Sequence, residues 1–278
     1  FEIESVDGQP LIVKLYRPGR WTKVMIQTEQ DFVSRLAESD AAVIPALTFN
    51  GQTLFNMDEF VLAVFPKKGG RAVDEFDKET WQQVGRLLGR THLIGDTLRD
   101  APRVHWRPSI ATQNHLDILS ASDTIQKSFQ TSFFDLAHRF IQQTNPLFDH
   151  CDQLLIHGDC HRGNFIYRPS EGIYLIDFDD IAVGSAAQDL WMLLPGNPDS
   201  CPNEMQWFRE GYETFREFPM SDLSLVPALR AMRIIHFAAW CALQVNEPDF
   251  ADHFPEWGTA RYWNELMQDL HQISLAEF

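Results

Sequence analysis

The stretch that decides the fold is "LLIHGDCHRGNFIY", residues 154–167, which is soon followed by "YLIDFDD", residues 174–180. In each stretch an apolar run typical of a buried strand ends in polar residues. Asp159 and Asn164 follow the first run, and Asp177 ends the second. Because charged and amide side chains are seldom buried without partners, this pair of loops predicts a polar functional site.

The residue types in the two loops suit a particular chemistry. Asp and Asn oxygens are hard ligands for Mg²⁺, and a further carboxylate that binds no metal can accept a proton from a hydroxyl group. Phosphoryl transfer from ATP needs this division of tasks. One Asp alone is more often a turn or cap residue, but HxDxxxxN followed by a strand and another Asp is a specific combination. A zinc site at His157, Cys160 and His161 is a weaker alternative, because no second ligand pair follows at suitable spacing.

Composition limits the class of protein. The chain has 278 residues, a length that favours about two domains, with 44% hydrophobic and 22% charged residues. The formal net charge of −16 argues against a nucleic-acid partner and permits a cationic substrate. The sequence contains no uninterrupted run of about 18 apolar residues and therefore predicts no transmembrane helix. We expect no membrane partner. The four cysteines show no disulfide or CxxC spacing, which favours free thiols in a reducing cytoplasm.

The pattern along the chain predicts an α+β protein. Its first part, residues 1–66, reads as a nucleotide-binding sheet lobe with one helix: hairpins over 1–16 and 46–56 with turns at Asp7-Gly8 and Asn50-Gly51, a helix over 22–38 and a strand over 60–66. A polar Gly-Gly hinge at 67–71 follows. The second part, residues 67–278, is mainly helical, with predicted helices over 81–94 (stopped by Gly95), 124–143, 204–218, 225–244 and 260–273, and short strands around 154–157, 165–167 and 173–176.

Two charged residues in the first part lie on otherwise apolar faces. Lys14 is inside the strand-like run "LIVKLY", where an outward-pointing lysine is an equally good explanation. Glu29 lies on the apolar stripe of Met25 and Phe32, where an unpaired carboxylate would cost several kcal/mol. An ion pair between Lys14 and Glu29 that holds nucleotide phosphates would explain both positions.

Several motifs together resemble a known family. "HGDCHRGN" followed by "LIDFDD" is similar to the catalytic and metal loops of the aminoglycoside phosphotransferase/choline kinase superfamily, relatives of eukaryotic protein kinases. With "VKLYRPGRW", "AVFPKKGGR" and "QDLWMLLPG", the set resembles a bacterial family of stress-response serine/threonine kinases, from about Leu11 to Trp263. The resemblance implies a two-lobed protein-kinase-like fold, with a small antiparallel sheet lobe and a larger helical lobe, and ATP-dependent phosphorylation of proteins.

The resemblance also implies roles for individual residues. Asp159 would be the catalytic base, and Asn164 and Asp177 would hold Mg²⁺. Lys14 and Glu29 would form the phosphate-binding pair.

Other positions carry less specific implications. Phe65 would lie in the hinge that touches adenine, and His161 would lie near the transferred phosphoryl group with a charge that depends on pH. Asp179 and Asp180 are read as solvated loop or cap residues, and Asp189 as a structural cap. Only one strand precedes Lys14, so a phosphate-covering loop cannot be assigned.

Three functions are compatible with these motifs. The first is a serine/threonine protein kinase that uses ATP on a protein substrate. The second is a kinase for a small-molecule alcohol such as a sugar, amino alcohol or aminoglycoside, because the same site would serve it. The third is a binding module without activity, which should lack Asp159, Asn164 or Asp177; all three are present.

Overall fold

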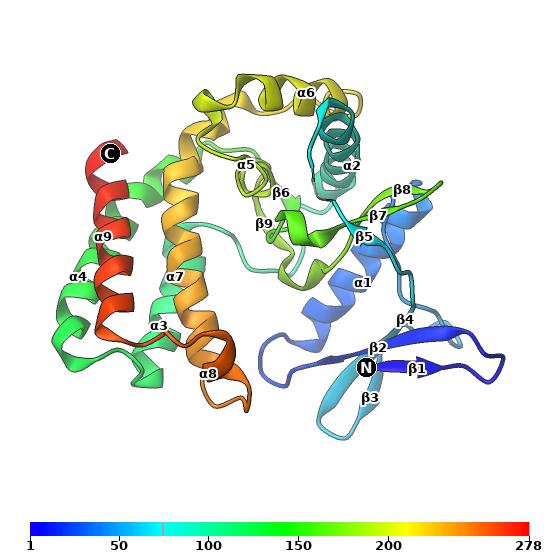
Figure 1. The fold of residues 1–278 in the computed structure, drawn as a ribbon, viewed down its shortest axis with the longest axis horizontal. Helices are drawn as coiled ribbons and strands as arrows, with labels where there is room; N and C mark the ends of the chain where they lie inside the picture. Colours follow the sequence, from blue (N-terminus) through cyan, green and yellow to red (C-terminus); the bar gives the residue numbers. More distant parts are fainter. Residues whose placement is uncertain (74, 278) are drawn as a thin grey trace. The chain divides into compact units, whose positions relative to one another are not determined.

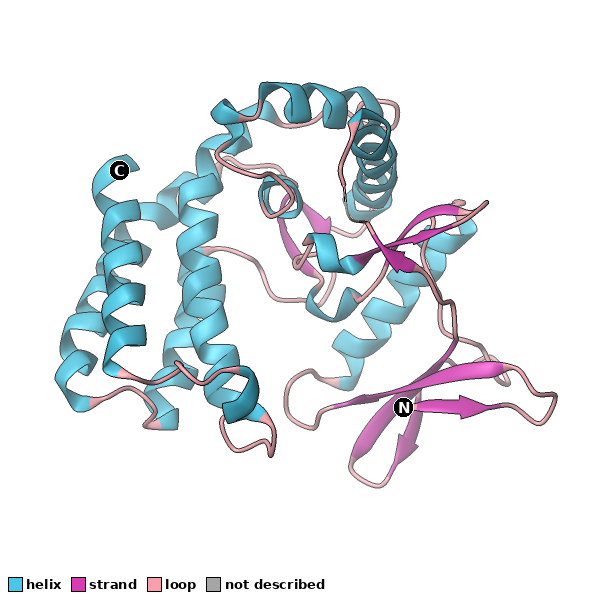
Figure 2. Ribbon diagram, in the orientation of Figure 1, coloured by secondary structure: helices cyan, strands magenta, loops and turns pink. Residues whose placement is uncertain are grey.

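The structure is a computed structural model that describes residues 1–73 and 75–277, with side chains described to residue 273. The chain forms two compact units, residues 1–103 with 153–220 and residues 104–152 with 221–278. Helices and antiparallel strands are both present (Figures 1 and 2), which confirms the predicted α+β class. The predicted boundary after residue 66 lies within the first unit and stays a prediction.

The first unit begins with an antiparallel sheet of order β1-β2-β4-β3, made of β1 (Glu2–Glu4), β2 (Pro10–Tyr16), β3 (Phe55–Met57) and β4 (Phe60–Pro66). The hairpin at Asp7-Gly8 is confirmed, and Gly8 supplies the positive φ of 76° that its turn needs. Helix α1 (Lys23–Glu38) is also confirmed, and its cap, Thr22, accepts a hydrogen bond from the Met25 amide at 3.3 Å.

The second predicted hairpin, over residues 46–56, does not form with the predicted strand pairing. Only one bridge, between Phe49 and Gln52, flanks the Asn50-Gly51 turn. Strand β3 instead pairs with β4 through a turn at Asp58, whose φ is 51°. The Asn50-Gly51 turn forms as predicted, but β3 pairs with the longer strand β4 and not with the residues before the turn.

The rest of the first unit surrounds the two acidic loops. A three-stranded sheet has the order β5-β7-β8, and β6 pairs with β9, a strand that the sequence analysis missed. Helix α6 ends at Tyr212, earlier than predicted. The elements are β5 (Arg71–Ala72), α2 (Lys78–Asp96), β6 (Gln153–Ile156), η3 (Arg162–Asn164), β7 (Phe165–Arg168), β8 (Gly172–Leu175), η4 (Phe178–Asp180), β9 (Ala182–Ser185), α5 (Ala187–Trp191) and α6 (Pro202–Tyr212).

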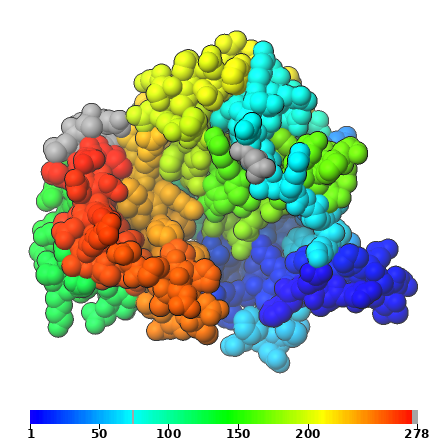
Figure 3. All heavy atoms as spheres, viewed as in Figure 1, coloured from blue at the N-terminus to red at the C-terminus, as the bar shows by residue number. Residues whose placement is uncertain are grey.

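Helices α2 and α6 pack against each other, where cyan and yellow atoms meet in Figure 3, and their backbones approach closely. A Cβ atom at Gly89 would lie 2.5 Å from the Tyr212 carbonyl oxygen, and one at Gly211 would lie 2.1 Å from that of Gln82. Only glycine fits at these two positions. The close approach brings His92 of α2 next to Tyr212 of α6, which matters for the site below.

The prediction that Gly95 ends α2 is wrong. Gly95 lies inside the helix, where a Cβ atom would be 2.0 Å from the Leu155 carbonyl oxygen of β6. The glycine is therefore needed for close helix–strand contact and not for a helix end.

The second unit is helical. It contains a π-helical turn at Pro108–Thr112 and the helices α3 (Gln113–Ser122, not predicted), α4 (Lys127–Thr144), α7 (Val226–Gln244), α8 (Phe250–His253) and α9 (Ala260–Glu277). Its core includes the edge-to-face pair Phe133 and Trp263, with ring centroids 5.6 Å apart. By length and composition Met220–Gln244 could cross a membrane, but 61% of its most apolar window is buried, as in a core helix of a globular protein.

Candidate active site

The first acidic loop, His157–Asn164, is called the HGD loop. It leaves the buried strand β6 through Gly158, whose φ is 83° and where a Cβ atom would lie 2.1 Å from the Asp180 carbonyl oxygen. The Asn164 side-chain amide donates a hydrogen bond to the Asp159 carbonyl oxygen at 2.8 Å. This bond closes the loop and fixes the backbone that carries the Asp159 carboxylate.

A buried carboxylate holds the start of the HGD loop from behind. Asp189 of α5 is 0% exposed and accepts hydrogen bonds from the backbone amides of His157 at 2.7 Å and Gly158 at 2.8 Å. His92 Nε2 lies 3.0 Å from the same carboxylate, and His92 Nδ1 lies 2.9 Å from the Tyr212 hydroxyl. Asp189 therefore has a structural role, as expected, but it fixes the HGD loop rather than capping a helix.

The second acidic loop, Asp177–Asp180, is called the DFDD loop, and backbone contacts tie it to the first. His157 Nε2 lies 3.0 Å from the Ile176 carbonyl oxygen, and the Ile176 amide donates to the Asn164 carbonyl oxygen at 3.0 Å. Asp177 follows at once with a φ of 64°, a strained conformation for a residue other than glycine. Its side chain is 56% exposed and so remains accessible.

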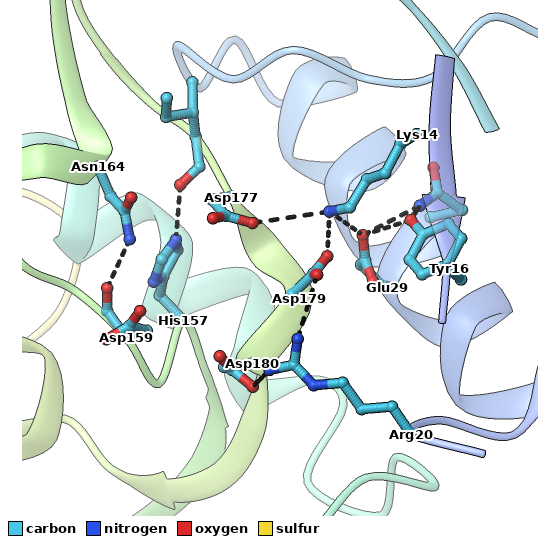
Figure 4. Close-up of polar contacts among 12 residues, drawn as sticks. Lys14, Tyr16, Arg20, Glu29, His157, Asp159, Asn164, Asp177, Asp179 and Asp180 are labelled. Carbon is cyan, nitrogen blue, oxygen red and sulfur yellow. Dashed lines mark hydrogen bonds and ion pairs between the residues drawn. The ribbon is translucent and has the colours of Figure 1, made fainter. Parts of the chain in front are cut away.

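Lys14 of β2 meets the DFDD loop through its ammonium group. The predicted ion pair is present, with Lys14 Nζ 3.6 Å from Glu29 Oε1, and Asp177 Oδ1 also lies 3.6 Å away (Figure 4). Asp179 makes a third ion pair with Lys14. Burial opposes the charge of the ammonium group, but the three carboxylates outweigh it and raise the pKa of Lys14.

Glu29 of α1 is 2% exposed. Burial in the lobe raises the pKa of Glu29 to about 7, against the opposing attraction of Lys14 and the hydrogen bond that Tyr16 donates. The charge of this carboxylate therefore depends on the groups around it.

The interpretation of Asp179 and Asp180 as solvated residues is wrong. Both side chains are only 21% exposed. Arg20, in the loop between β2 and α1, lies 2.7 Å from Asp180 Oδ1 and 3.6 Å from Asp179 Oδ2. The DFDD loop is thus held by Lys14 of β2 and by Arg20 of the loop after β2 (Figure 4).

A second arginine was missed as well. Arg103 is buried, and its guanidinium donates to the carbonyl oxygens of Ile181 at 2.8 Å and Met25 at 3.2 Å, and to that of Asp179. It also lies over the Trp21 ring, 4.3 Å from its centroid. Arg103 therefore joins the first turn of α1 to the DFDD loop. Nothing in the sequence around it indicated this role, because its partners are far away along the chain.

A cavity of about 720 Å³ opens beside these residues. Its size is typical of a small-molecule site. Phe65 lines it, while Lys14, Glu29 and Asp177 line its polar part. Contact of Phe65 with a base stays a prediction. The other walls are mainly apolar, among them Ile12, Val33, Ile44, Ile166 and Leu175.

His161 lies beside the Asp159 carboxylate. Its Nδ1 accepts a hydrogen bond from the Gly163 amide at 3.0 Å, and its Nε2 lies 3.7 Å from Asp159 Oδ2. The imidazole is 43% exposed. The structure thus brings His161 next to Asp159, and its predicted place near the transferred phosphoryl group stays a prediction.

The alternative of a zinc site finds no support. His157 and Cys160 are completely buried, and His157 Nε2 already contacts the Ile176 carbonyl oxygen. Among the described residues no group of three or more His, Cys, Asp or Glu side chains is arranged to hold a metal ion alone.

Comparisons with known proteins agree with this geometry. A sequence profile described as "Phosphotransferase enzyme family" matches residues 1–233. The chain is 34% identical over 269 residues to stress response kinase A of Escherichia coli (strain K12), covering 95% of this chain and 80% of the relative. It is 32% identical, with the same coverage, to the serine/threonine protein kinase RdoA of Salmonella typhimurium (strain LT2).

Solved structures show the same fold. An amicoumacin kinase in complex with AMP-PNP, Ca²⁺ and its antibiotic aligns with a TM-score of 0.74 at 20% identity, covering 98% of this chain and 84% of that one. A microcompartment-associated aminopropanol kinase aligns with a TM-score of 0.61 at 18% identity, covering 97% and 89%. With a family profile that spans most of its length and kinases among its relatives, the chain belongs to the phosphotransferase enzyme family and is an ATP-dependent kinase.

Proposed function

We propose that this kinase transfers the γ-phosphoryl group of ATP to a serine or threonine hydroxyl of a protein, in the cytoplasm, as part of a bacterial stress response. The observation that carries the proposal is that Asp177, which pairs with Lys14, directly follows Ile176, whose backbone contacts both His157 and Asn164 of the HGD loop. The names of the curated relatives support a protein as the acceptor.

The residues present fit a Mg²⁺ ion. The Asn164 amide nitrogen donates to the Asp159 carbonyl, which leaves the Asn164 side-chain oxygen as the atom for a ligand. The Asp177 carboxylate is the second oxygen donor, and its side chain is more than half exposed. We assign both residues to Mg²⁺, which when bound neutralises charge on the phosphates of ATP.

Asp159 is assigned as the base that accepts the proton of the acceptor hydroxyl. Its loop is fixed by Asn164 and Asp189, so the carboxylate is already placed when the acceptor arrives. His161, whose Nε2 lies 3.7 Å from Asp159, is assigned next to the transferred group, where its charge would help to balance the phosphoryl oxygens.

The remaining roles belong to the cavity. Lys14 is assigned to the phosphates, with Glu29 as the carboxylate that orients it. Phe65, on the hinge side of β4, is assigned to the base, since it lines the apolar part of the same cavity.

Labelled ATP tests the acceptor class. The enzyme and an Asp159→Asn control are each incubated with [γ-³²P]ATP and Mg²⁺, once with a desalted protein fraction and once with the small-molecule fraction of the same cells. We expect label on serine and threonine of proteins with the wild-type enzyme only. Label that enters the small-molecule fraction alone would overturn the protein acceptor while leaving the kinase activity intact.

A small-molecule alcohol is the second candidate acceptor. The net charge of −16 suits a cationic substrate, and the neighbours in structure include kinases for an antibiotic and an amino alcohol. This candidate predicts turnover with an amino alcohol or aminoglycoside and no labelled protein.

A further inference from the structure

Two neutral side chains next to the Lys14–Glu29 pair are used by no step above. The Tyr16 hydroxyl donates to Glu29 Oε1 at 2.7 Å. Gln30 Nε2 donates to Tyr16 Oη at 2.7 Å and to Glu29 Oε1 at 3.2 Å. Tyr16, Glu29 and Gln30 are all buried.

We propose that Tyr16 and Gln30 are positioning residues that hold the Glu29 carboxylate in place and favour its charged form, and so keep Lys14 oriented for the phosphates of ATP. The inference rests on the proposed role of the Lys14–Glu29 pair. It assigns a function to residues that the sequence presents only as strand and helix positions.

The distances show which groups orient Glu29. Lys14 and Tyr16 are two residues apart on β2 and therefore point to the same face of the sheet. Around Glu29 Oε1 the Tyr16 hydroxyl lies at 2.7 Å, whereas Lys14 Nζ lies at 3.6 Å, beyond hydrogen-bond distance. Glu29 Oε2 has no hydrogen-bond partner among the described residues. The neutral donors, and not the lysine, thus fix the position of the Glu29 carboxylate.

The charges around Glu29 show why these donors matter. Lys14 and Tyr16 face it from β2, Asp179 from η4, and Arg103 from the segment after α2. Burial raises the pKa of Glu29 to about 7 and Asp179 adds to the rise, while Lys14, Tyr16 and Arg103 lower it. Loss of the Tyr16 hydroxyl would raise this pKa further. A larger fraction of Glu29 would then be protonated at neutral pH, and Lys14 would lose one of its three charged partners.

Nucleotide binding in Tyr16→Phe tests the inference without an acceptor. Calorimetry with Mg-ADP should show affinity about fivefold below wild type near pH ~6.5 and within about twofold near pH ~8.5, because a lost hydrogen bond moves the carboxylate titration by about one pH unit. Tyr174→Phe is the matched control, since it removes a hydroxyl that donates to the exposed Glu171 at 2.9 Å. The control should bind as wild type at both pH values.

A Glu29→Gln background distinguishes an effect of Tyr16 through the Glu29 carboxylate from a nonspecific disturbance of the structure. Without a carboxylate to titrate, adding Tyr16→Phe should no longer change the pH dependence of binding. Gln30→Met should change the pH dependence of Mg-ADP affinity in the same direction as Tyr16→Phe. It replaces Tyr16→Phe in the test if that variant does not fold. The inference is overturned if the Tyr16→Phe effect is equal at both pH values or persists in the Glu29→Gln background. Failure of protein phosphorylation with these binding results intact would instead count against the acceptor class alone.

Discussion

The HGD and DFDD loops lie side by side, yet they are held in opposite ways. The HGD loop is fixed by Asp189, a completely buried carboxylate that accepts two backbone amides. The DFDD loop is fixed by the cations Lys14, Arg20 and Arg103, and its first carboxylate, Asp177, is more than half exposed. Buried hydrogen bonds resist salt and solvent, whereas partly exposed ion pairs are screened. The comparison indicates that the HGD loop is held by buried hydrogen bonds, whereas the position of the DFDD loop depends in part on exposed charges, since of its three cations only Arg103 is buried.

The sharpest separation of the loops uses their proposed catalytic members. Asp159→Asn keeps the size and hydrogen bonding of the side chain but removes the proton acceptor, so kcat should fall by about 10²–10⁴-fold. Mg-ATP affinity should stay within a few-fold of wild type, because ground-state contacts survive. Single-turnover rates and calorimetric titration measure the two quantities. If Asp159→Asn loses nucleotide binding instead, the assignment of the HGD loop to the acceptor side is wrong.

Asp189 tests whether the HGD loop is structurally fixed. Asp189→Ala leaves two buried amides and the His92 imidazole without their acceptor, so the free energy of unfolding should fall by about 3–5 kcal/mol. Asp180→Ala removes a partly exposed partner of Arg20 and should cost no more than about 1 kcal/mol. Urea unfolding compares the two variants. Equal losses would show that the two loops are held with similar strength.

Asp177 tests the metal-binding assignment of the DFDD loop. Asp177→Asn removes a negative ligand from a hard dication, so Mg-nucleotide affinity should fall by at least about tenfold and the rate should fall with it. Nucleotide affinity in the absence of Mg²⁺ should not fall, since the lost negative charge repels phosphate. Titrations with and without the metal measure both. Unchanged affinity for Mg-ATP would remove Asp177 from the site.

The two loops were also unequally predictable from sequence. Asp159, Asn164 and Asp177 stand in local motifs, and Glu29 interrupts an apolar helix stripe, so spacing alone marks them. The cations that hold the DFDD loop give no such signal. Arg20 lies 160 residues from its partner Asp180, and no local pattern reports so distant a contact.

The fold was predictable to a similar extent. Helix α1 and strand β4 have strong periodicity or a continuous apolar run and were found. Strand β9, with the residues "AVGS", is too short and small to show a pattern and is defined by pairing with β6. Gly95 was read as a helix end because the local rule cannot see the Leu155 carbonyl that requires it.

His161 provides a further test of the HGD loop, with a smaller expected effect on kcat than Asp159. Its imidazole is exposed enough that solvent weakens its interaction with a phosphoryl group, so His161→Ala should lower kcat about fivefold at most, the equivalent of about 1 kcal/mol. His161→Lys keeps a positive charge there and should retain activity. Stopped-flow measurement of phosphoryl transfer tests both variants. Unchanged kinetics in His161→Ala would show it to be a packed loop residue.

Arg20 gives the smallest expected effect and the most direct test of the DFDD loop. Arg20→Gln removes two ion pairs, to Asp179 and Asp180, but leaves Lys14 and Arg103 in place. Because the lost pairs are partly exposed, Mg-ADP affinity should fall only about two- to threefold in low salt. In wild type the same contribution should disappear when salt is raised to about 0.5 M, since exposed pairs are screened. The two proteins should therefore bind equally in high salt, as calorimetry at both salt concentrations can show. A difference that persists in high salt would mean that Arg20 acts through packing against Trp21, 5.3 Å from that ring's centroid, and that the DFDD loop is as rigid as its neighbour.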